Sequence, residues 1–408
     1  MSQAGNPYRY WLFDPIPRLD HRLPRRTEPA YSYLNESARP EAALNRLYYR
    51  TWLARYPARE RADLVRRFRS RDDRAHTAAA FELFLHELLV SLGAGVTIPE
   101  ERQGQTRYDF DVEEGDSVTA VEAAVVSDED EDDRVRQRRR DELLDHLDQM
   151  RHPRLAVAVR EAMINPSKAP PYGRLREAMI RLLDSATEDQ IAQWAGHIAA
   201  RDFGRLPRWR YERDGSRVVL SPVPIPPGVQ LRGHVVELPE NTLMQAITVG
   251  DALLAKIRTK ASRRYDLGDR PLVLALASTH WGGASDDQVF RALLGTERHP
   301  VVRSADGNAT LGQPFRDRDG SWGPHSRHGL TSVSAVLIFY RFQVWNPWDT
   351  RWHAYMNPWA RTPPPAWLQR LPRWVSTGDG FLHRYDGIAL RDLVGPPVEP
   401  VHLPDLRW

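Results

Sequence analysis

The stretch AAAFELFLHELLVSLGAGVTIPEERQGQTRYDFDVEEGDSVTAVEAAVV, residues Ala78–Val126, decides the fold that the sequence predicts. Apolar residues at helical spacing fill 78–92, and the glycines that follow end that helix. A short strand, a loop and a β-hairpin come next, because residues 108–113 alternate in polarity and residues 118–125 alternate more loosely. The segment EGDS at 114–117 is a typical four-residue turn between the two strands.

The hairpin carries most of its acidic groups on one face. A symmetric turn pairs Glu113 with Val118 and places Asp109 opposite Glu122. The two-residue period then separates a polar face from an apolar face, with Asp109, Asp111, Glu122 and Ala124 on the first and Phe110, Val112, Val121, Ala123 and Val125 on the second. Opposed residues have Cβ atoms roughly 4.5–5.5 Å apart, so the paired carboxylates repel each other. A divalent cation between them, or a fully solvated acidic face, relieves that repulsion.

Two further segments carry charges that can reach this face. The helix before the hairpin contains Glu82 and Glu87. A second helical stretch, VGDALLAKIRTKASRR at 249–264, has Lys256 and Lys260 four residues apart on one side. The run PLVLALA follows it at once and is typical of a buried strand. The predicted order is therefore helix with glutamate, strand, strand with aspartate, strand with glutamate, helix with lysine, strand.

That order resembles the αβββαβ core of the PD-(D/E)xK, or restriction-endonuclease-like, nuclease superfamily, which predicts an α/β fold with a mixed sheet. Asp109 in Tyr-Asp-Phe matches the motif aspartate, and Glu122 in Glu-Ala-Ala matches the glutamate of ExK. Tyr108 replaces the usual proline, and Ala124 stands where the family places lysine. Some members supply the lysine from the following helix, and Lys260, with Lys256 as second choice, would do so here.

A wider pattern resembles a group of uncharacterised bacterial proteins with this layout. The stretches that carry it are YLNESARPEA, RFRSRDDRAHTAAAFELFLHELL, RYDFDVE, KASRRYDLGDRPLVLA and TSVSAVLIF. This likeness runs over most of the chain, and it supports the fold more than the function.

The resemblance implies Mg²⁺- or Mn²⁺-dependent hydrolysis of nucleic-acid phosphodiesters, with DNA as the expected partner. Asp109 and Glu122 would bind the metal, helped by a backbone carbonyl near Ala123. Glu82 would complete the acidic site, and Asp111 would support it or become a ligand if the register shifts. The alternative is a nuclease-shaped protein without chemistry that binds or regulates, for example in phage defence, as Ala124 would suggest. A structural protein with no nucleic-acid partner is a third possibility.

The length of 408 residues allows two to three domains. We expect an N-terminal helical segment at 1–77 and a split core at 78–126 and 249–278. Between the two halves we expect an α/β insertion at 127–248. The region 279–408 is rich in tryptophan and proline and has a strong strand near 331–342 that we expect to join the main sheet. Its aromatic residues either stack on unpaired bases or, as we favour, pack against the core.

Composition excludes several classes of protein. Hydrophobic residues make up 41% and charged residues 27%, as in ordinary soluble globular proteins. No run of eighteen apolar residues and no basic–apolar leader occurs, so we expect neither a membrane span nor a signal peptide. The absence of cysteine excludes disulfides and thiolate metal sites and fits a cytoplasmic protein. A net charge of +3 does not by itself indicate nucleic-acid binding.

Overall fold

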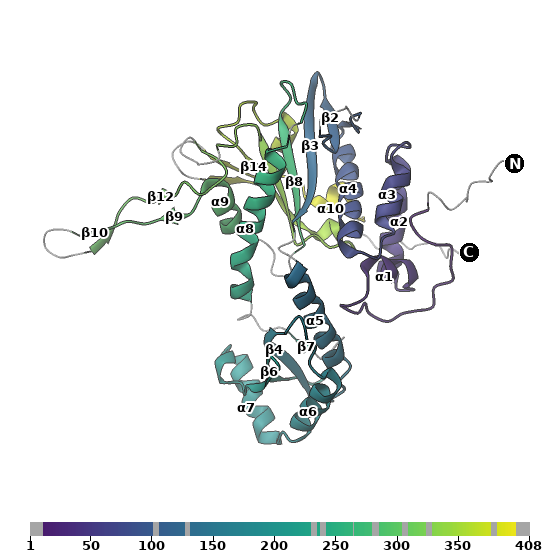
Figure 1. Ribbon diagram of the computed structural model, residues 1–408, viewed down its shortest axis with the longest axis vertical. Helices are drawn as coiled ribbons and strands as arrows, with labels where there is room; N and C mark the ends of the chain where they lie inside the picture. The colour runs from purple at the N-terminus through teal and green to yellow at the C-terminus, as the bar shows by residue number, and fades with distance from the viewer. Residues whose placement is uncertain are drawn as a thin grey trace. The chain divides into compact units, whose positions relative to one another are not determined.

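The computed structural model divides into two units. One comprises Met1–His21, Pro29–Ser127 and Ala246–Trp408, and the other comprises Arg22–Glu28 and Asp128–Gln245 (Figure 1). The residues described are 11–100, 106–126, 131–229, 235–236, 242–263, 265–279, 285–303, 309–323, 329–376 and 382–396. The second unit therefore corresponds to the expected insertion together with a short segment from near the N-terminus.

The first unit is built on an eight-stranded mixed sheet, so the chain is an α/β protein. The strand order is β1-β2-β3-β8-β13-β14-β15-β16. The strands are β1 (Gly95–Thr97), β2 (Phe110–Glu114), β3 (Ser117–Val126), β8 (Leu272–Ser278), β13 (Ala335–Tyr340), β14 (Arg351–Met356), β15 (Arg373–Ser376) and β16 (Leu382–Tyr385). β1, β2 and β3 form an antiparallel meander, and β8 and β13 run parallel to β3. The strand predicted near 331–342 is confirmed as β13.

The register of the β2–β3 hairpin agrees with the prediction, since Glu113 pairs with Val118 and Phe110 with Val121. The two faces of the hairpin also separate as the two-residue period requires. Phe110 and Val121 enter a core with helix α4, whereas Ala120 enters the core on the α8 face. By the same alternation, Asp109, Asp111 and Glu122 belong to the α8 side of the sheet.

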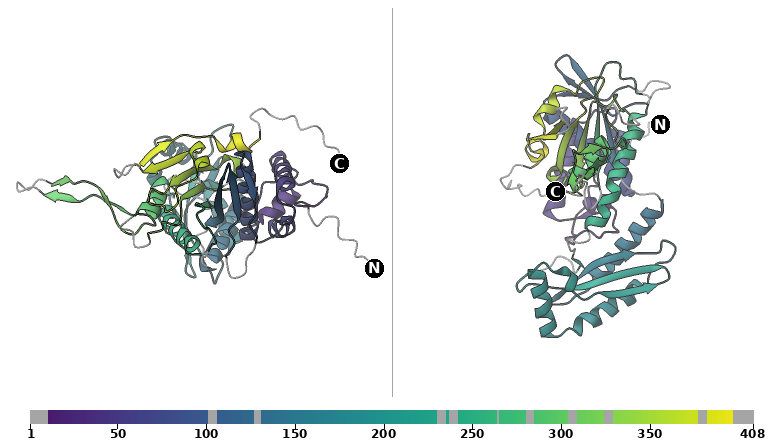
Figure 2. Two further views of the ribbon diagram at one scale, coloured as in Figure 1. Left: turned by 90° about the horizontal axis from the view of Figure 1, so that it is seen from above. Right: turned by 90° about the vertical axis from the view of Figure 1, so that its left-hand side faces the viewer.

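Helices cover both faces of the sheet (Figure 2). α4 (Asp73–Ser91) buries Phe81 and Phe84 on one face, and α8 (Thr242–Ala261) buries Leu253 and Ile257 on the other. α9 (Asp286–Leu294) lies on the α8 side. The predicted start of α4 at residue 78 was five residues late. The polar first turn is helical because the Asp72 side chain caps it, accepting from the Arg74 N–H at 3.1 Å.

The N-terminal helices α1 (Ala30–Glu36), α2 (Pro40–Arg55) and α3 (Arg61–Phe68) pack against the α4 core. The YLNES stretch ends α1, where the last carbonyls of a helix lack partners of their own. Arg46 donates to the carbonyl oxygens of Leu34 and Ser37 at 2.6 and 2.9 Å, and Arg18 donates to that of Asn35 at 2.7 Å. These arginines fix the turn from α1 into α2.

The C-terminal part adds the strands at one edge of the sheet and a projecting two-stranded arm (Figure 1). The arm pairs β9 (Glu297–Arg298) with β12 (Phe315–Arg316) and β10 (Val301–Arg303) with β11 (Ala309–Leu311). A short helix, α10 (Leu390–Val394), contributes to the α4 core. Trp348 and Trp352 are buried there, as expected of core-packing aromatics, while Trp345 and Trp359 are exposed.

The second unit has its own four-stranded sheet and its own core. The strand order is β5-β6-β4-β7, with β4 (Leu155–Met163), β5 (Trp209–Arg213), β6 (Ser216–Pro224) and β7 (Val235–Val236). The helices are α5 (Glu131–Asp148), α6 (Tyr172–Asp184) and α7 (Glu188–Ala199). Asp214 and Gly215 have φ of 53° and 74°, the left-handed pair that a tight hairpin turn requires, so the predicted hairpin is confirmed.

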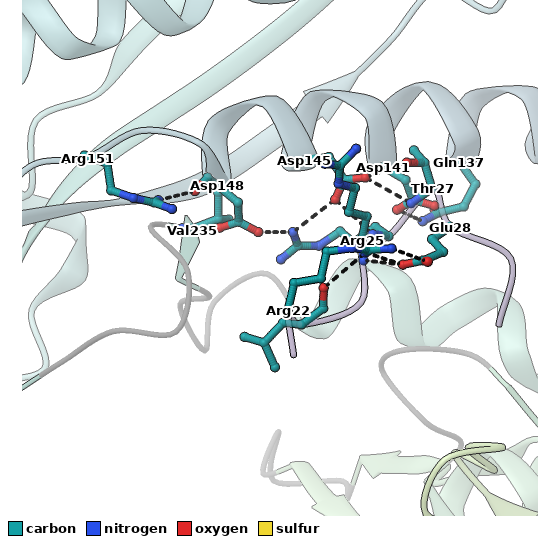
Figure 3. Close-up of polar contacts among 12 residues, drawn as sticks. Arg22, Arg25, Thr27, Glu28, Gln137, Asp141, Asp145, Asp148, Arg151 and Val235 are labelled. Atoms are coloured by element: carbon teal, nitrogen blue, oxygen red, sulfur yellow. Dashed lines mark hydrogen bonds and ion pairs between the residues drawn. The ribbon is translucent and has the colours of Figure 1, made fainter. Parts of the chain in front are cut away.

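The segment Arg22–Glu28 belongs to the second unit because α5 binds it through aspartates (Figure 3). Asp145 accepts from the backbone N–H groups of Arg26 and Thr27 at 2.9 and 3.0 Å. Asp148 forms an ion pair with Arg26 and accepts from the Val235 N–H at 2.8 Å. The contacts with Arg26 and Thr27 join residues more than a hundred positions apart, which the periodicity of the sequence does not reveal.

Among the helices of the described ranges, none has the length and apolar character needed to cross a bilayer.

Candidate active site

Asp109 lies at the point where β2 begins. Its N–H donates to the Val121 carbonyl at 3.1 Å, which continues the ladder by one residue. Its side chain then turns toward β3, and Oδ2 accepts from the Ala123 N–H at 2.7 Å. The Asp109 carboxyl therefore accepts the hydrogen bond from the Ala123 N–H that a main-chain carbonyl would accept if β2 were longer.

Glu122 lies in the middle of β3, next to Leu274 of the neighbouring strand β8, and its side chain is only 3% exposed. Two cations share its Oε1: the Nζ of Lys260 forms an ion pair with it, and Nη1 of Arg263 lies 3.4 Å away. Oε2 is buried and has no hydrogen-bond donor among the described residues. Tyr265 lies near enough for Glu122 to contribute, after burial, to raising the pKa of its phenol.

Lys260 lies in the last turn of α8, and Arg263 follows two residues after the helix ends at Ala261. Both reach Oε1 of Glu122. The chain has 54 arginines but only three lysines, namely Lys168, Lys256 and Lys260. A compact ammonium and a guanidinium are not interchangeable in a buried site. In a chain with so few lysines, the placement of two of them four residues apart singles out this side of α8 as a candidate for the site.

Glu82 lies on α4 and is held by neighbours of its own. Its carboxylate accepts from the Tyr56 hydroxyl at 2.6 Å and from Arg67 at 2.7 and 3.1 Å. Glu87, the other glutamate considered on this helix, is buried and forms an ion pair with Arg55. Glu82 thus borders the site without contacting Glu122.

The electrostatic environment of Asp109 is strongly perturbed. Burial raises the pKa of Asp109 to about 8, and the charges of Glu122 and Glu82 act in the same direction. The Ala123 N–H and Lys260 oppose this shift only in part. These influences together favour the protonated form of the Asp109 carboxyl, which lies beside Glu122 and its two cations.

Two other predicted residues lie apart from this pair. Asp111 accepts from the Tyr108 hydroxyl at 2.8 Å and pairs with Arg270 at 3.3 Å, so it has its own cation two residues along β2. Lys256 forms no ion pair with a carboxylate in the described part of the chain. Burial lowers the pKa of Lys256, and the nearby cations Arg74, Lys260 and Arg263 lower it further.

Sequence analysis missed Arg263 and Tyr265, which follow Lys260 within the stretch KASRRYDLGDRPLVLA. Arg263 lies beyond the end of α8 at Ala261, so helical spacing from Lys260 does not predict its direction. Tyr265 lies beyond the end of α8, where helical spacing no longer predicts the direction of a side chain.

Within the described ranges, no cluster of three or more histidine, aspartate or glutamate side chains is arranged to hold a metal ion. The donor set around Glu122 and Asp109 consists instead of two carboxylates. An unpartnered Glu122 oxygen and a carboxyl with a raised pKa both indicate negative potential that the protein compensates incompletely. This environment suits a further cation.

Comparisons with protein-family models, with curated proteins and with solved structures found no match to this chain. The geometry of the site is therefore the basis for a proposed function.

Proposed function

We propose that this protein is a divalent-metal-dependent nuclease of the PD-(D/E)xK type, with Asp109, Glu122 and Lys260 at its catalytic centre. The observation that carries the proposal is the ion pair between Lys260 and Glu122. On this proposal, α8 supplies the cation that Ala124, in the motif position on β3, does not.

The arrangement of elements around the site supports this proposal. β1, β2 and β3 form a meander, and β8 adds to it parallel to β3. α4 precedes the meander on one face, and α8 covers the other face before β8. An αβββαβ nuclease core has this order of elements. Fold alone does not establish a reaction. The side chains of Asp109, Glu122 and Lys260 therefore carry the proposal.

The donors fit a hard divalent ion. Asp109, Glu122 and the main-chain carbonyl of Ala123 would hold Mg²⁺ or Mn²⁺, which are oxygen-preferring cations. The free Glu122 oxygen is one acceptor, and the Ala123 carbonyl leaves β3 on the same side as its N–H, toward Asp109. Such an ion supplies an activated water and neutralises charge on the phosphate when bound.

The protein's own groups then have distinct roles. The Ala123 N–H fixes one oxygen of Asp109, which leaves the other available to a ligand. Lys260 is 14% exposed, so its ammonium can hold the attacking water or stabilise charge on a phosphoryl oxygen in a poorly hydrated setting. Arg67 and Tyr56 keep Glu82 beside Asp109, where its charge favours a cation. The proposed substrate is nucleic acid, with DNA as the first to test.

Plasmid nicking in Mg²⁺ or Mn²⁺ tests this proposal, with a matched pair of variants on one strand. Asp109→Asn should lower the nicking rate by at least about a hundredfold, because the amide cannot bind the metal as a carboxylate does. Asp111→Asn, two residues away and paired with Arg270, should stay within about threefold of wild type. Absence of metal-dependent nicking by the wild type, or equal loss in both variants, would contradict the proposal.

One observation favours the second candidate, a nuclease-shaped binding protein without chemistry. Ala124 leaves the motif position on β3 without a lysine, and Glu122 is already compensated by Lys260 and Arg263. This candidate predicts that the wild type binds DNA with the same affinity whether or not metal is present, and never nicks it.

A further inference from the structure

Lys260 and Arg263 share Oε1 of Glu122, the carboxylate whose other oxygen the proposed function assigns to the metal. Resting on that proposed function, we infer that these two cations compete with the divalent ion for Glu122. The metal enters as Lys260 withdraws, and the ion pair thereby sets the metal affinity of the site.

Burial makes this competition strong. The Glu122 side chain is 3% exposed and that of Lys260 is 14% exposed, so little water separates charges at this point. Like charges repel more strongly in such a setting than in bulk water. A divalent ion, an ammonium and a guanidinium around Glu122 would bring four positive charges to one carboxylate, whereas Asp109 and Glu82 add at most two negative charges nearby. The ion and the two side chains therefore exclude each other on Glu122.

The two cations differ in how easily they can leave. Arg263 is 40% exposed and lies past the last residue of α8, so solvent already reaches it. Its contact with Glu122 is the longer one, at 3.4 Å. Lys260 is more buried and lies within the last turn of the helix, so its ammonium is the principal competitor. Lys256, one turn earlier on the same helix, provides a control because no recorded ion pair joins it to Glu122.

Calorimetric titration with Mn²⁺ alone tests the competition. Lys260→Met should bind Mn²⁺ about tenfold or more tightly than wild type, because it removes the principal competitor while keeping the length of the side chain. Arg263→Met should show a smaller gain, and Lys256→Met should match wild type. Unchanged or weaker binding by folded Lys260→Met would overturn the inference.

A second readout uses the unmodified protein, in case Lys260→Met fails to fold. Acylation followed by mass spectrometry reports on each of the three lysines separately. Mn²⁺ should increase the labelling of Lys260 severalfold, while Lys168, which pairs with Asp214, and Lys256 change little. Labelling of Lys260 that stays constant at saturating Mn²⁺ would overturn the inference.

The outcomes separate this inference from the proposed function. If wild type and Lys260→Met bind Mn²⁺ equally and the wild type nicks DNA, the competition is wrong and the nuclease proposal stands. If no variant binds Mn²⁺ at millimolar concentration, both are wrong.

Discussion

Two carboxylates of the first unit, Glu122 and Asp286, lie in polar clusters of opposite character. Asp286 is in the first turn of α9 and accepts from the hydroxyls of Tyr340 and Tyr355 at 2.6 and 2.9 Å. Arg351 lies 3.4 Å from its second oxygen. Glu122 instead faces two cations and a second carboxyl group, and one of its oxygens has no donor among the described residues.

The difference separates a carboxylate with a structural role, Asp286, from one in the proposed active site, Glu122. Hydroxyl groups from β13 and β14 satisfy Asp286 and thereby attach the start of α9 to the sheet. Both oxygens of Asp286 thus have protein donors, although the buried His353 Nδ1, 3.7 Å from Oδ1, makes no hydrogen bond within the described residues. A carboxylate held in this way specifies structure. Glu122 is held by Lys260 and Arg263, which a bound ion would displace on the inference above, and it lies beside an Asp109 whose pKa is raised. Strongly perturbed carboxyls of that kind are typical of functional sites.

The largest expected effect is on the pH dependence of stability. Burial raises the pKa of Asp109 from 3.8 to about 8, so the folded chain keeps a proton that the unfolded chain releases. The free energy of unfolding should therefore fall by several kcal/mol as the pH rises from about 4 to about 8. Asp109→Asn should flatten this decline in urea unfolding followed across that range. Asp141 in the second unit, with a pKa of about 7, acts with the same sign, so the difference between variant and wild type is the informative quantity.

Parallel curves for Asp109→Asn and wild type would mean that Asp109 titrates normally. The contrast between Glu122 and Asp286 would then lose its electrostatic basis.

The next effect is the loss of the charge at Glu122. Glu122→Gln should lower the free energy of unfolding by about 3 kcal/mol, because Lys260 and Arg263 lose the carboxylate that they share. Glu113→Gln, exposed on β2, is the matched control and should change stability by less than about 0.5 kcal/mol. Chemical denaturation of the three proteins measures both values. Equal stability of Glu122→Gln and wild type would show that the ion pair is not formed.

Removal of the Asp286 carboxylate should lower the free energy of unfolding somewhat less than Glu122→Gln does. Asp286→Ala leaves two buried tyrosine hydroxyls without their acceptor, which should lower the free energy of unfolding by about 2 kcal/mol. The nicking rate per folded molecule should not change, because Asp286 contacts none of Asp109, Glu122 or Lys260. A nicking rate that falls more than the folded fraction would make the Asp286 cluster part of the active site.

The smallest expected effect is that of replacing one tyrosine by phenylalanine in the Asp286 cluster or near Glu122. Tyr355→Phe removes a hydroxyl bonded to Asp286 and Tyr340 and should cost about 1 kcal/mol. Tyr265→Phe should stay within about 0.5 kcal/mol, because that hydroxyl lies close to Glu122 without a well-formed hydrogen bond. Thermal unfolding of both variants measures the contrast. A comparable loss for Tyr265→Phe would show that its hydroxyl binds Glu122 and that Oε2 is not free.

Local pattern predicted much of the core. The alternation around EGDS gave the register of β2 and β3, and the apolar runs gave β8 and β13. These features depend on neighbours in the chain, whose spacing directly determines which face a side chain occupies. The start of α4 was missed because a capping residue, not an apolar one, begins it.

The composition of the site was only partly predictable. Lys260 could be proposed from its spacing. Lys256 shares its side of α8, so the choice between them depends on how far along its axis the helix is placed against β3. Arg263 and Tyr265 approach Glu122 from beyond the helix end, and the path of a loop is set by tertiary contacts. The binding of Arg22–Glu28 to α5 likewise depends on aspartates more than a hundred residues away.

The most direct test of the central claim is plasmid nicking in Mn²⁺ by wild type, Lys260→Met and Lys256→Met. If Lys260 supplies the catalytic cation, its variant should lose at least about a hundredfold in rate while retaining or improving Mn²⁺ binding. Lys256→Met, on the same helix, should remain within about threefold of wild type. Nicking by Lys260→Met at the wild-type rate, or equal losses in both variants, would contradict the assignment of this site.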